Sequence, residues 1–272
     1  MEETQEVQTS LLYNGEVVVE FNPNAKRNRY KITDCGVLLK PPPVSVTTIT
    51  DLKDKSGPLM HWAVNNAIMV CEEKILPDQV HGVGFLLDVW KEARQKYKDV
   101  KKKAADAGTL AHHALENYFS QPPEEFAPPL AGTPVRARFD EALKWFASYK
   151  IESIARERRV YSRKYGYTGT LDHLSRVESI LSLLDYKAAK NVYSTYVFQI
   201  AAYIMAYEEE TGECIEQAYI LQIGEEKTVP YIYNRAQLET AFEGFLGLLQ
   251  MYKADKALGK IKPQEEDWIE AL

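Results

Sequence analysis

The chain has 272 residues, of which 45% are hydrophobic, and its formal net charge is −6 at pH 7. A chain of this length and apolar content can bury a sizeable core, and it predicts one elaborated domain. The negative charge balance argues against a generic nucleic-acid coat. It leaves room for a local basic groove, because charge distribution matters more than the sum.

Three scattered cysteines, Cys35, Cys71 and Cys214, form no CxxC pair. They predict neither a zinc site nor an iron–sulfur cluster, which takes four thiolates, and they suit a reducing compartment. No apolar run approaches the length of a membrane span, so no membrane contact is expected. The acidic N-terminus lacks the apolar region of a signal peptide, and we expect a cytoplasmic protein.

The N-terminal third predicts a hairpin followed by helices. Alternating apolar residues over positions 11–33 indicate two β-strands joined by a turn-rich segment. Helices are predicted over Thr47–Asp54, from Pro58 onwards, and over Val83–Lys98. The stretch Lys91–Lys103 holds seven basic and two acidic residues. It is either a solvated helix face or a nucleic-acid contact.

The next predicted helix carries a set of polar residues. Gly108, His112 and Glu116 recur every four residues, which places them on one narrow face beside an apolar stripe. Here His112 and Glu116 can reach one cation or one phosphate, unless His112 is an ordinary core histidine. Close approach of another backbone would explain a glycine at this position. A proline-rich extended loop, Gln121–Pro134, follows, and then a helix over Pro134–Ile151.

Two predicted strands, Thr168–Val177 and Ile180–Lys187, organise the chain. A turn centred on Glu178-Ser179 pairs residues whose numbers sum to 357, so Asp172 lies opposite Asp185. Like charges at directly opposed positions are destabilising unless something neutralises them.

The second of these strands ends in charged residues. Leu181 and Leu183 anchor one of its faces in a core, and the same face continues with Asp185 and Lys187. A divalent cation between Asp172 and Asp185, with Lys187 alongside, explains this ending. The alternative is an Asp185–Lys187 surface pair with Asp172 in a turn.

The last elements are a buried helix, a hairpin and a capped helix. The stretch Tyr193–Glu209 is apolar nearly all round, and Gln199 and Tyr203 lie on its polar-tipped stripe. A hairpin around Gly224 follows. The final helix begins after Asn234, with a capping-box glutamine three residues on.

Four motifs now stand in sequence order, and they resemble the RecB-like branch of the PD-(D/E)xK nuclease superfamily. The pattern is closest to phage exonucleases and the mitochondrial genome maintenance exonuclease. Thr170 precedes the first aspartate without the usual proline, and Ala188 and Ala189 stand where many relatives carry a hydroxyl. The motifs are a helix with Gly108, His112 and Glu116, the strand Tyr167–Asp172, the strand Leu184–Lys187, and a helix with Gln199 and Tyr203.

The resemblance implies an α/β (α+β) fold with a restriction-endonuclease-like core, a mixed central β-sheet flanked by helices, and a helical N-terminal elaboration. It predicts a single nuclease domain over residues 1–272. Within it, residues 1–103 form the N-terminal hairpin and helices, 104–257 the core, and 258–272 an acidic tail.

The function that the resemblance implies is a DNA exonuclease that depends on Mg²⁺ or Mn²⁺. It would hydrolyse phosphodiester bonds of single-stranded DNA or DNA ends, in recombination, repair or phage replication, in a bacterial or phage-infected cell. Three alternatives stay open: an end-independent or structure-specific endonuclease, a non-catalytic DNA-binding module, and an unrelated hydrolase built on His112 and His113. The sequence identifies no protein partner.

The implied roles fall on three groups of residues. The catalytic group is Asp172, Asp185, Lys187 and Glu116. The metal ligands are His112, Asp172, Asp185 and the backbone carbonyl of Tyr186. DNA would be contacted or positioned by Gln199, Tyr203, Lys190, Lys101, Lys102 and Lys103.

Overall fold

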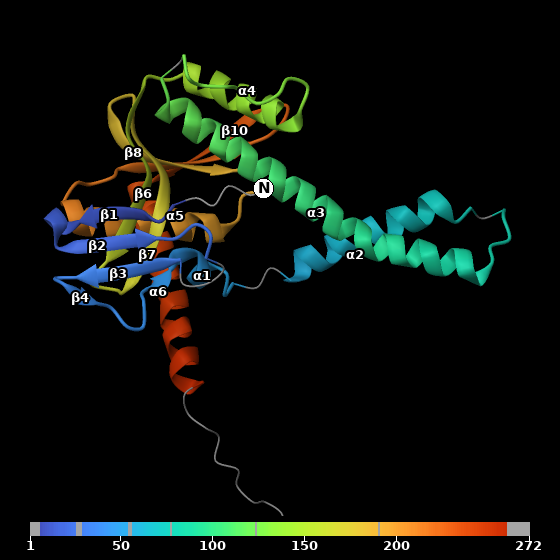
Figure 1. The fold of residues 1–272 in the computed structure, drawn as a ribbon, viewed down its shortest axis with the longest axis horizontal. Helices are drawn as coiled ribbons and strands as arrows, with labels where there is room; N and C mark the ends of the chain where they lie inside the picture. The colour runs from blue at the N-terminus through green and yellow to red at the C-terminus, as the bar shows by residue number, and fades with distance from the viewer. Residues whose placement is uncertain are drawn as a thin grey trace, which may run out of the picture.

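The structure is a computed structural model, and it describes residues 6–25, 29–53, 56–76, 78–122, 124–189 and 191–259. A six-stranded mixed sheet lies at its centre, with helices on both faces, as the sequence predicts (Figure 1). Its strands are β5 (Val44–Ser45), β6 (Ile151–Ser162), β7 (Tyr167–Val177), β8 (Ile180–Lys187), β9 (Gln217–Ile223) and β10 (Thr228–Asn234).

The strand order is β10-β9-β8-β7-β5, and β6 also pairs with β7. The pairs β8–β9 and β5–β7 are parallel, whereas β6–β7, β7–β8 and β9–β10 are antiparallel. The hairpin β7–β8 has the predicted register, since Val177 pairs with Ile180 and His173 pairs with Leu184. Its turn places Glu178 and Ser179 at φ 49° and 71°, a region that favours glycine.

Two helices cover one face of this sheet, α5 (Ser194–Thr211) and α6 (Arg235–Leu258). Leu181 and Leu183 of β8 belong to the core beneath them, as predicted for this face of the strand. The helix α5 buries residues around much of its circumference, and α6 begins with the predicted capping box of Asn234 and Gln237.

The other face carries α4 (Pro134–Ala147) and the C-terminal half of α3 (Val83–Ser120). Phe139 and Phe146 of α4 and Leu115 of α3 pack there against Leu184 of β8. Successive β8 residues therefore belong to different cores, as expected for a strand in which adjacent side chains alternate between faces.

The helix α3 corrects the sequence analysis, which predicts one helix to Lys98 and a separate one around Gly108. The structure shows one helix of 38 residues. Ala, Asp and Lys between the two predicted pieces continue a helix readily, and a single glycine costs only about 1 kcal/mol. The predicted boundary between positions 103 and 104 therefore falls inside α3.

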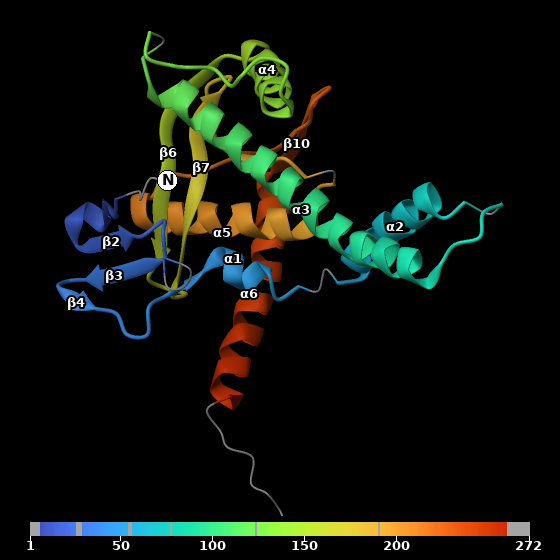
Figure 2. The same ribbon diagram turned by 45° about the vertical axis from the view of Figure 1, so that its right-hand side comes forward.

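The helix α2 (Ser56–Lys74) pairs with the first half of α3. Val70 of α2 packs there against Val89 and Ala93 of α3. Figures 1 and 2 show this helical hairpin extending away from the sheet. Among the described residues, no helix combines the length and apolar character needed to cross a bilayer.

The predicted N-terminal hairpin is part of a four-stranded antiparallel sheet, which is a second correction. Its fourth strand has only two residues, too few to give an alternation signal. This sheet packs on Tyr161 of β6. The strands are β1 (Gln8–Leu12), β2 (Val17–Phe21), β3 (Tyr30–Asp34) and β4 (Val37–Leu38). A short helix, α1 (Val46–Thr50), then follows β5 and ends earlier than predicted.

Candidate active site

The site lies where β8 separates from β7. Their antiparallel pairing runs from Val177 and Ile180 as far as His173 and Leu184, and it stops before Asp172 and Asp185. Beyond this point the first residues of β7 pair with β5. The backbone N–H of Tyr186 turns to the side chain of Asp172 and donates to Oδ2 at 3.0 Å. The opposed aspartates thus flank a fork in the sheet.

A third acidic residue, Glu157, stands on the other side of Asp172. In the β6–β7 ladder Arg156 pairs with His173 and Arg158 with Leu171, so Glu157 lies opposite Asp172. Its φ of 45° lies in the left-handed region, which a residue with a Cβ adopts at a cost in energy. Glu157, Asp172 and Asp185 therefore form one acidic row across three neighbouring strands.

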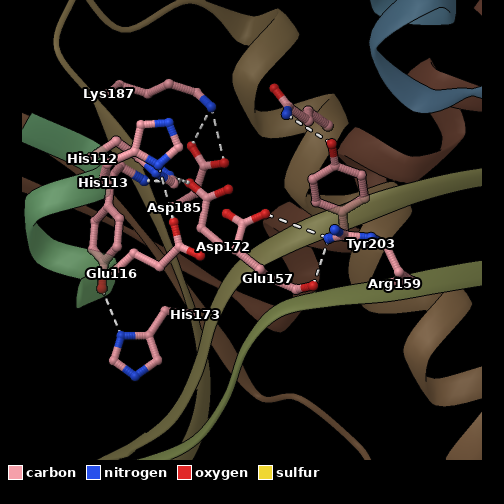
Figure 3. Close-up of polar contacts among 12 residues, drawn as sticks. His112, His113, Glu116, Glu157, Arg159, Asp172, His173, Asp185, Lys187 and Tyr203 are labelled. Atoms are coloured by element: carbon pink, nitrogen blue, oxygen red, sulfur yellow. Dashed lines mark hydrogen bonds and ion pairs between the residues drawn. The ribbon is translucent and has the colours of Figure 1, made fainter. Parts of the chain in front are cut away.

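His112 joins this row from α3. Its Nε2 lies 3.0 Å from Asp172 Oδ2, and its ring packs edge-on against Tyr186. One ligand atom each from His112, Glu157 and Asp172 lie within 4.8 Å of one another (Figure 3). Ligand atoms this close together can bind one metal ion.

Asp185 is bound to Lys187. The ammonium lies 3.0 Å from Oδ1 and 2.8 Å from Oδ2 of this buried carboxylate. The contact to Oδ2 lacks hydrogen-bond geometry, so that oxygen has no hydrogen-bond donor among the described residues. On its other side Lys187 lies 5.2 Å from the ring centre of Tyr196.

Burial and neighbouring charges push the carboxyl pKa values apart. Burial raises the pKa of Asp185 to about 6, against the opposing effect of Lys187. Burial also favours the neutral form of Asp172, but His112, Lys187 and the Tyr186 N–H outweigh it and lower the pKa to about 2. Burial, with Asp172 and Glu116, raises the pKa of Glu157 to about 7.

The two basic groups of the site show the reciprocal effect. Burial lowers the pKa of His112, but Asp172 outweighs this and the pKa rises to about 9. The pKa of Lys187 is also raised, because Asp185 and Asp172 outweigh burial. Both groups are therefore cationic at neutral pH and balance part of the acidic row.

Glu116 contacts His113 in the structure, and the catalytic role predicted for it beside His112 stays a prediction. Its Oε2 lies 3.3 Å from Nδ1 of His113, and both side chains are partly exposed. Tyr186 contributes its N–H to the site, and the role predicted for its carbonyl stays a prediction.

Two glycines bring the motifs together. A Cβ on Gly108 would lie 2.9 Å from the side-chain Cβ of Ala188, so α3 lies close to the chain just after β8. A Cβ on Gly169 would lie 2.4 Å from the ring of Tyr203. Gln199 Nε2 donates to Tyr203 Oη at 2.9 Å, so this pair supports β7 from behind. Direct contact of either residue with DNA remains a prediction.

Two of the predicted basic residues lie on α3, roughly three turns before His112. Lys102 and Lys103 are exposed on α3. The backbone of Lys101 lies in the same helix, but its side chain is outside the described part of the structure. Lys190 lies outside the described residues.

Sequence reasoning missed Glu157 and the buried arginine beside it. Arg159 is 3% exposed and donates to the backbone carbonyl of Glu157 at 2.6 Å. Its other hydrogen bonds reach Glu157 Oε2 at 3.5 Å, Thr170 Oγ1, which also bonds Tyr30 Oη, and Oε1 of Gln8. The β6–β7 register could have indicated Glu157, but the sequence does not show the backbone distortion at this residue.

His173, next to Asp172, has a structural role. Its ring nitrogens are hydrogen-bonded to Tyr186 Oη at 2.6 Å and to Ser153 Oγ at 2.8 Å. Burial lowers its pKa to about 3, so it is neutral at physiological pH. His173 thus holds the aromatic ring against which His112 packs.

No protein-family model and no curated protein matches the sequence. Among solved structures, the chain is similar to a candidate exonuclease from Eubacterium rectale, with 16% identity and a TM-score of 0.37 over 58% of this chain and 70% of that one. It is also similar to an alkaline exonuclease from Laribacter hongkongensis, with 11% identity and a TM-score of 0.25 over 74% and 98% of the two chains. Both similarities are distant, and the case for a function comes from the geometry of the site.

Proposed function

We propose that the protein is a divalent-metal-dependent nuclease that hydrolyses phosphodiester bonds in DNA. The observation that carries this proposal is the acidic row at the strand fork, with His112 on one side and Lys187 on the other. Carboxylates aligned in this way repel one another, and a cation compensates for that repulsion.

The donor set fits Mg²⁺ or Mn²⁺. Hard carboxylate oxygens suit both ions, and an imidazole adds tolerance for manganese. Asp172, Glu157 and His112 would hold the ion. The buried Oδ2 of Asp185 is a further oxygen that could bind it. When bound, the cation lowers the pKa of a coordinated water and neutralises charge on the phosphate.

The chain's own residues would divide the remaining work. Lys187 stays protonated beside Asp185, and its partial exposure lets the ammonium meet a phosphate oxygen as negative charge develops there. The pKa of Glu157 is about 7 in the metal-free protein, so near neutral pH this carboxyl group can give up its proton to a cation that binds there. Arg159 fixes the backbone of Glu157 from behind.

All four motifs meet at this site, which supports membership of the RecB-like branch of the PD-(D/E)xK superfamily. Gly108 contacts Ala188, His112 contacts Asp172, and Gly169 packs on Tyr203. Membership favours an exonuclease that acts on single strands or DNA ends, in the cytoplasm, during recombination, repair or phage replication. The same geometry serves an endonuclease, so the choice between them is a matter for experiment.

One assay tests the proposal. End-labelled linear single strands and covalently closed circles are incubated with Mg²⁺ or Mn²⁺, using wild type, Asp172→Asn and Asp140→Asn. Asp140 is a partly exposed carboxylate in an ion pair on α4 and serves as the control. Wild type and Asp140→Asn should degrade linear DNA only, and Asp172→Asn neither substrate. Loss of the circles would indicate an endonuclease, and full activity of Asp172→Asn would overturn the assignment.

A further inference from the structure

In the outer half of α3, the side of the helix in line with His112 carries basic residues and no acidic ones. With 3.6 residues per turn, successive side chains are about 100° apart. Of the basic residues whose side chains the structure describes, four fall within about 80° of the direction of His112. The acidic residues of the same segment fall roughly 120–160° from that direction. The basic residues are Lys91, Arg94, Lys98 and Lys102, and the acidic ones are Asp88, Glu92, Asp99 and Asp106. We call the first set the basic stripe.

The stripe is exposed and mostly without acidic partners. All four of its side chains are exposed. Lys91 forms an ion pair with Asp88, while within the described part of the chain no acidic partner is recorded for Arg94, Lys98 or Lys102. Three cations that stay unneutralised on one side of a helix create a positive surface for an anionic polymer.

The continuity of α3 connects the stripe to the active site. Arg94 precedes His112 by 18 residues, which is about 27 Å at 1.5 Å per residue. His112 points at Asp172, so a strand that follows the stripe along the helix is led to the acidic row. Figure 2 shows the outer half of α3 projecting beyond the sheet, with α2 beside it.

An exposed aromatic residue lies next to the stripe. Trp90 is 56% exposed, and it lies within about one turn of Arg94 on the same side of the helix. Both residues line an apolar hollow of about 380 Å³, whose other walls come mainly from α2. The wall residues of α2 are Ala63, Val64, Ala67 and Cys71. Bases of a single strand stack on exposed aromatic rings, whereas a duplex keeps its bases paired inside.

We propose that the basic stripe and Trp90 form a binding surface for single-stranded DNA, which guides the strand to the active site. Arg94, Lys98 and Lys102 contact successive phosphates, and Trp90 stacks on a base. This inference rests on the proposed nuclease function for the destination of the strand, but the binding surface itself needs no metal.

The test compares two charge reversals on one helix. Lys98→Glu lies on the stripe, and Lys96→Glu lies about 160° away from it around the same helix. Both side chains are exposed, so neither change affects a core. Binding of a fluorescein-labelled single strand of about 20 nucleotides, which exceeds the span of the stripe, is measured by anisotropy in EDTA across a range of salt concentrations.

We expect Lys98→Glu to weaken binding at least about threefold and to reduce the salt slope by about 0.7, the value for one lost phosphate contact. Lys96→Glu should match wild type. Trp90→Ala should weaken binding about fivefold or more. Trp90→Phe keeps a stacking ring and should retain most of the wild-type affinity. Equal effects of the two lysine variants on binding would overturn the proposal that the basic stripe binds DNA. Equal binding of blunt duplex, with no effect of Trp90→Ala, would overturn the single-strand assignment.

A parallel assay with Mn²⁺ separates this inference from the nuclease proposal. If the protein is a nuclease, Lys98→Glu should raise KM for the same strand far more than it lowers kcat. If wild type does not cleave but the binding differences persist, the nuclease proposal fails and the binding surface stands. If wild type cleaves and Lys98→Glu binds as well as Lys96→Glu does, the proposed binding surface is wrong and the nuclease proposal stands.

Discussion

His112 Nε2 lies 3.0 Å from Asp172 Oδ2, and this contact joins the C-terminal half of α3 to the middle of β7. In the metal-free protein the protonated imidazole is the main partner of that carboxylate. Asp185 has a second cation, Lys187, within 3.0 Å. The two opposed aspartates are therefore in different electrostatic states, and five predictions follow from this asymmetry and from the packing around it.

The two aspartates should respond differently to neutralisation. The folded pKa of Asp172, about 2, lies below its unfolded value, so its charge stabilises the fold above about pH 4. The folded pKa of Asp185, about 6, lies above the unfolded value of this residue. Ionisation of Asp185 therefore destabilises the metal-free fold as pH rises through 6. Asp172→Asn should lower the free energy of unfolding at pH 8 by roughly 1–2 kcal/mol, and Asp185→Asn should not.

Urea unfolding in EDTA at pH 5 and pH 8 measures this difference. Both variants should lose cleavage. Equal destabilisation by the two changes at pH 8 would mean that the aspartates share one electrostatic state.

Glu157 should contribute to metal binding. A cation that binds only the folded state adds about 2.7 kcal/mol at a concentration one hundred times its Kd. Mn²⁺ should therefore raise the Tm of wild type. It should raise the Tm of Glu157→Gln much less. Glu152→Gln, an exposed change on the same strand, should retain the full shift. An unchanged shift in Glu157→Gln, measured by calorimetry, would place the ion away from β6.

Metal binding should release protons. The pKa of His112 is about 9, so at pH 7 the imidazole must lose a proton before it coordinates. The affinity for Mn²⁺ should rise as pH increases from 7 to 9, by up to about tenfold per unit, and level off above the pKa. Titration calorimetry in buffers of different ionisation enthalpy counts the protons. Binding that is independent of pH over this range would mean that His112 is no ligand.

Lys187 should act on turnover more than on substrate binding. Only the transition state needs its charge beside the attacked phosphate, so Lys187→Ala should reduce kcat by about two orders of magnitude or more. DNA affinity in Ca²⁺ should change little. A variant that lost affinity and kept its kcat would identify Lys187 as a phosphate anchor. Lys164→Ala, on the loop between β6 and β7, provides a control.

Gly169 should be intolerant of a side chain. A Cβ there would come within 2.4 Å of the Tyr203 ring, and overpacking of this kind costs about 1–3 kcal/mol. Gly247→Ala is the matched control, because nothing lies within 4 Å of its added Cβ. Position 247 is an exposed position of helix α6, so that change should stabilise the fold by up to about 1 kcal/mol. Thermal unfolding of both variants compares the effects, and equal stability would show that Tyr203 yields to the methyl group.

The sequence predicts the β7–β8 hairpin well because its turn centre determines every pair along it. The opposed positions of Asp172 and Asp185 follow from the same pairing rule. Glu157 could not be found in the same way, because its left-handed backbone and its buried partner Arg159 depend on tertiary packing. The break predicted in α3 has a related cause, since the glycine weakens the helix locally while contacts with α2 and the sheet support it.

The hydrogen bonds of Arg159 also bear on when the acidic row can assemble during synthesis of the chain. This arginine holds Glu157, and it is in turn supported by Gln8 and by Thr170, which is hydrogen-bonded to Tyr30. Gln8 and Tyr30 lie about 130–150 positions before Arg159 in the chain. Contacts of such long sequence separation form late and slowly in folding. During synthesis β1 and β3 emerge well before β6, β7 and β8 exist to receive them. A nascent chain would therefore have no assembled acidic row, and hydrolytic activity would begin only after the strand fork has left the ribosome.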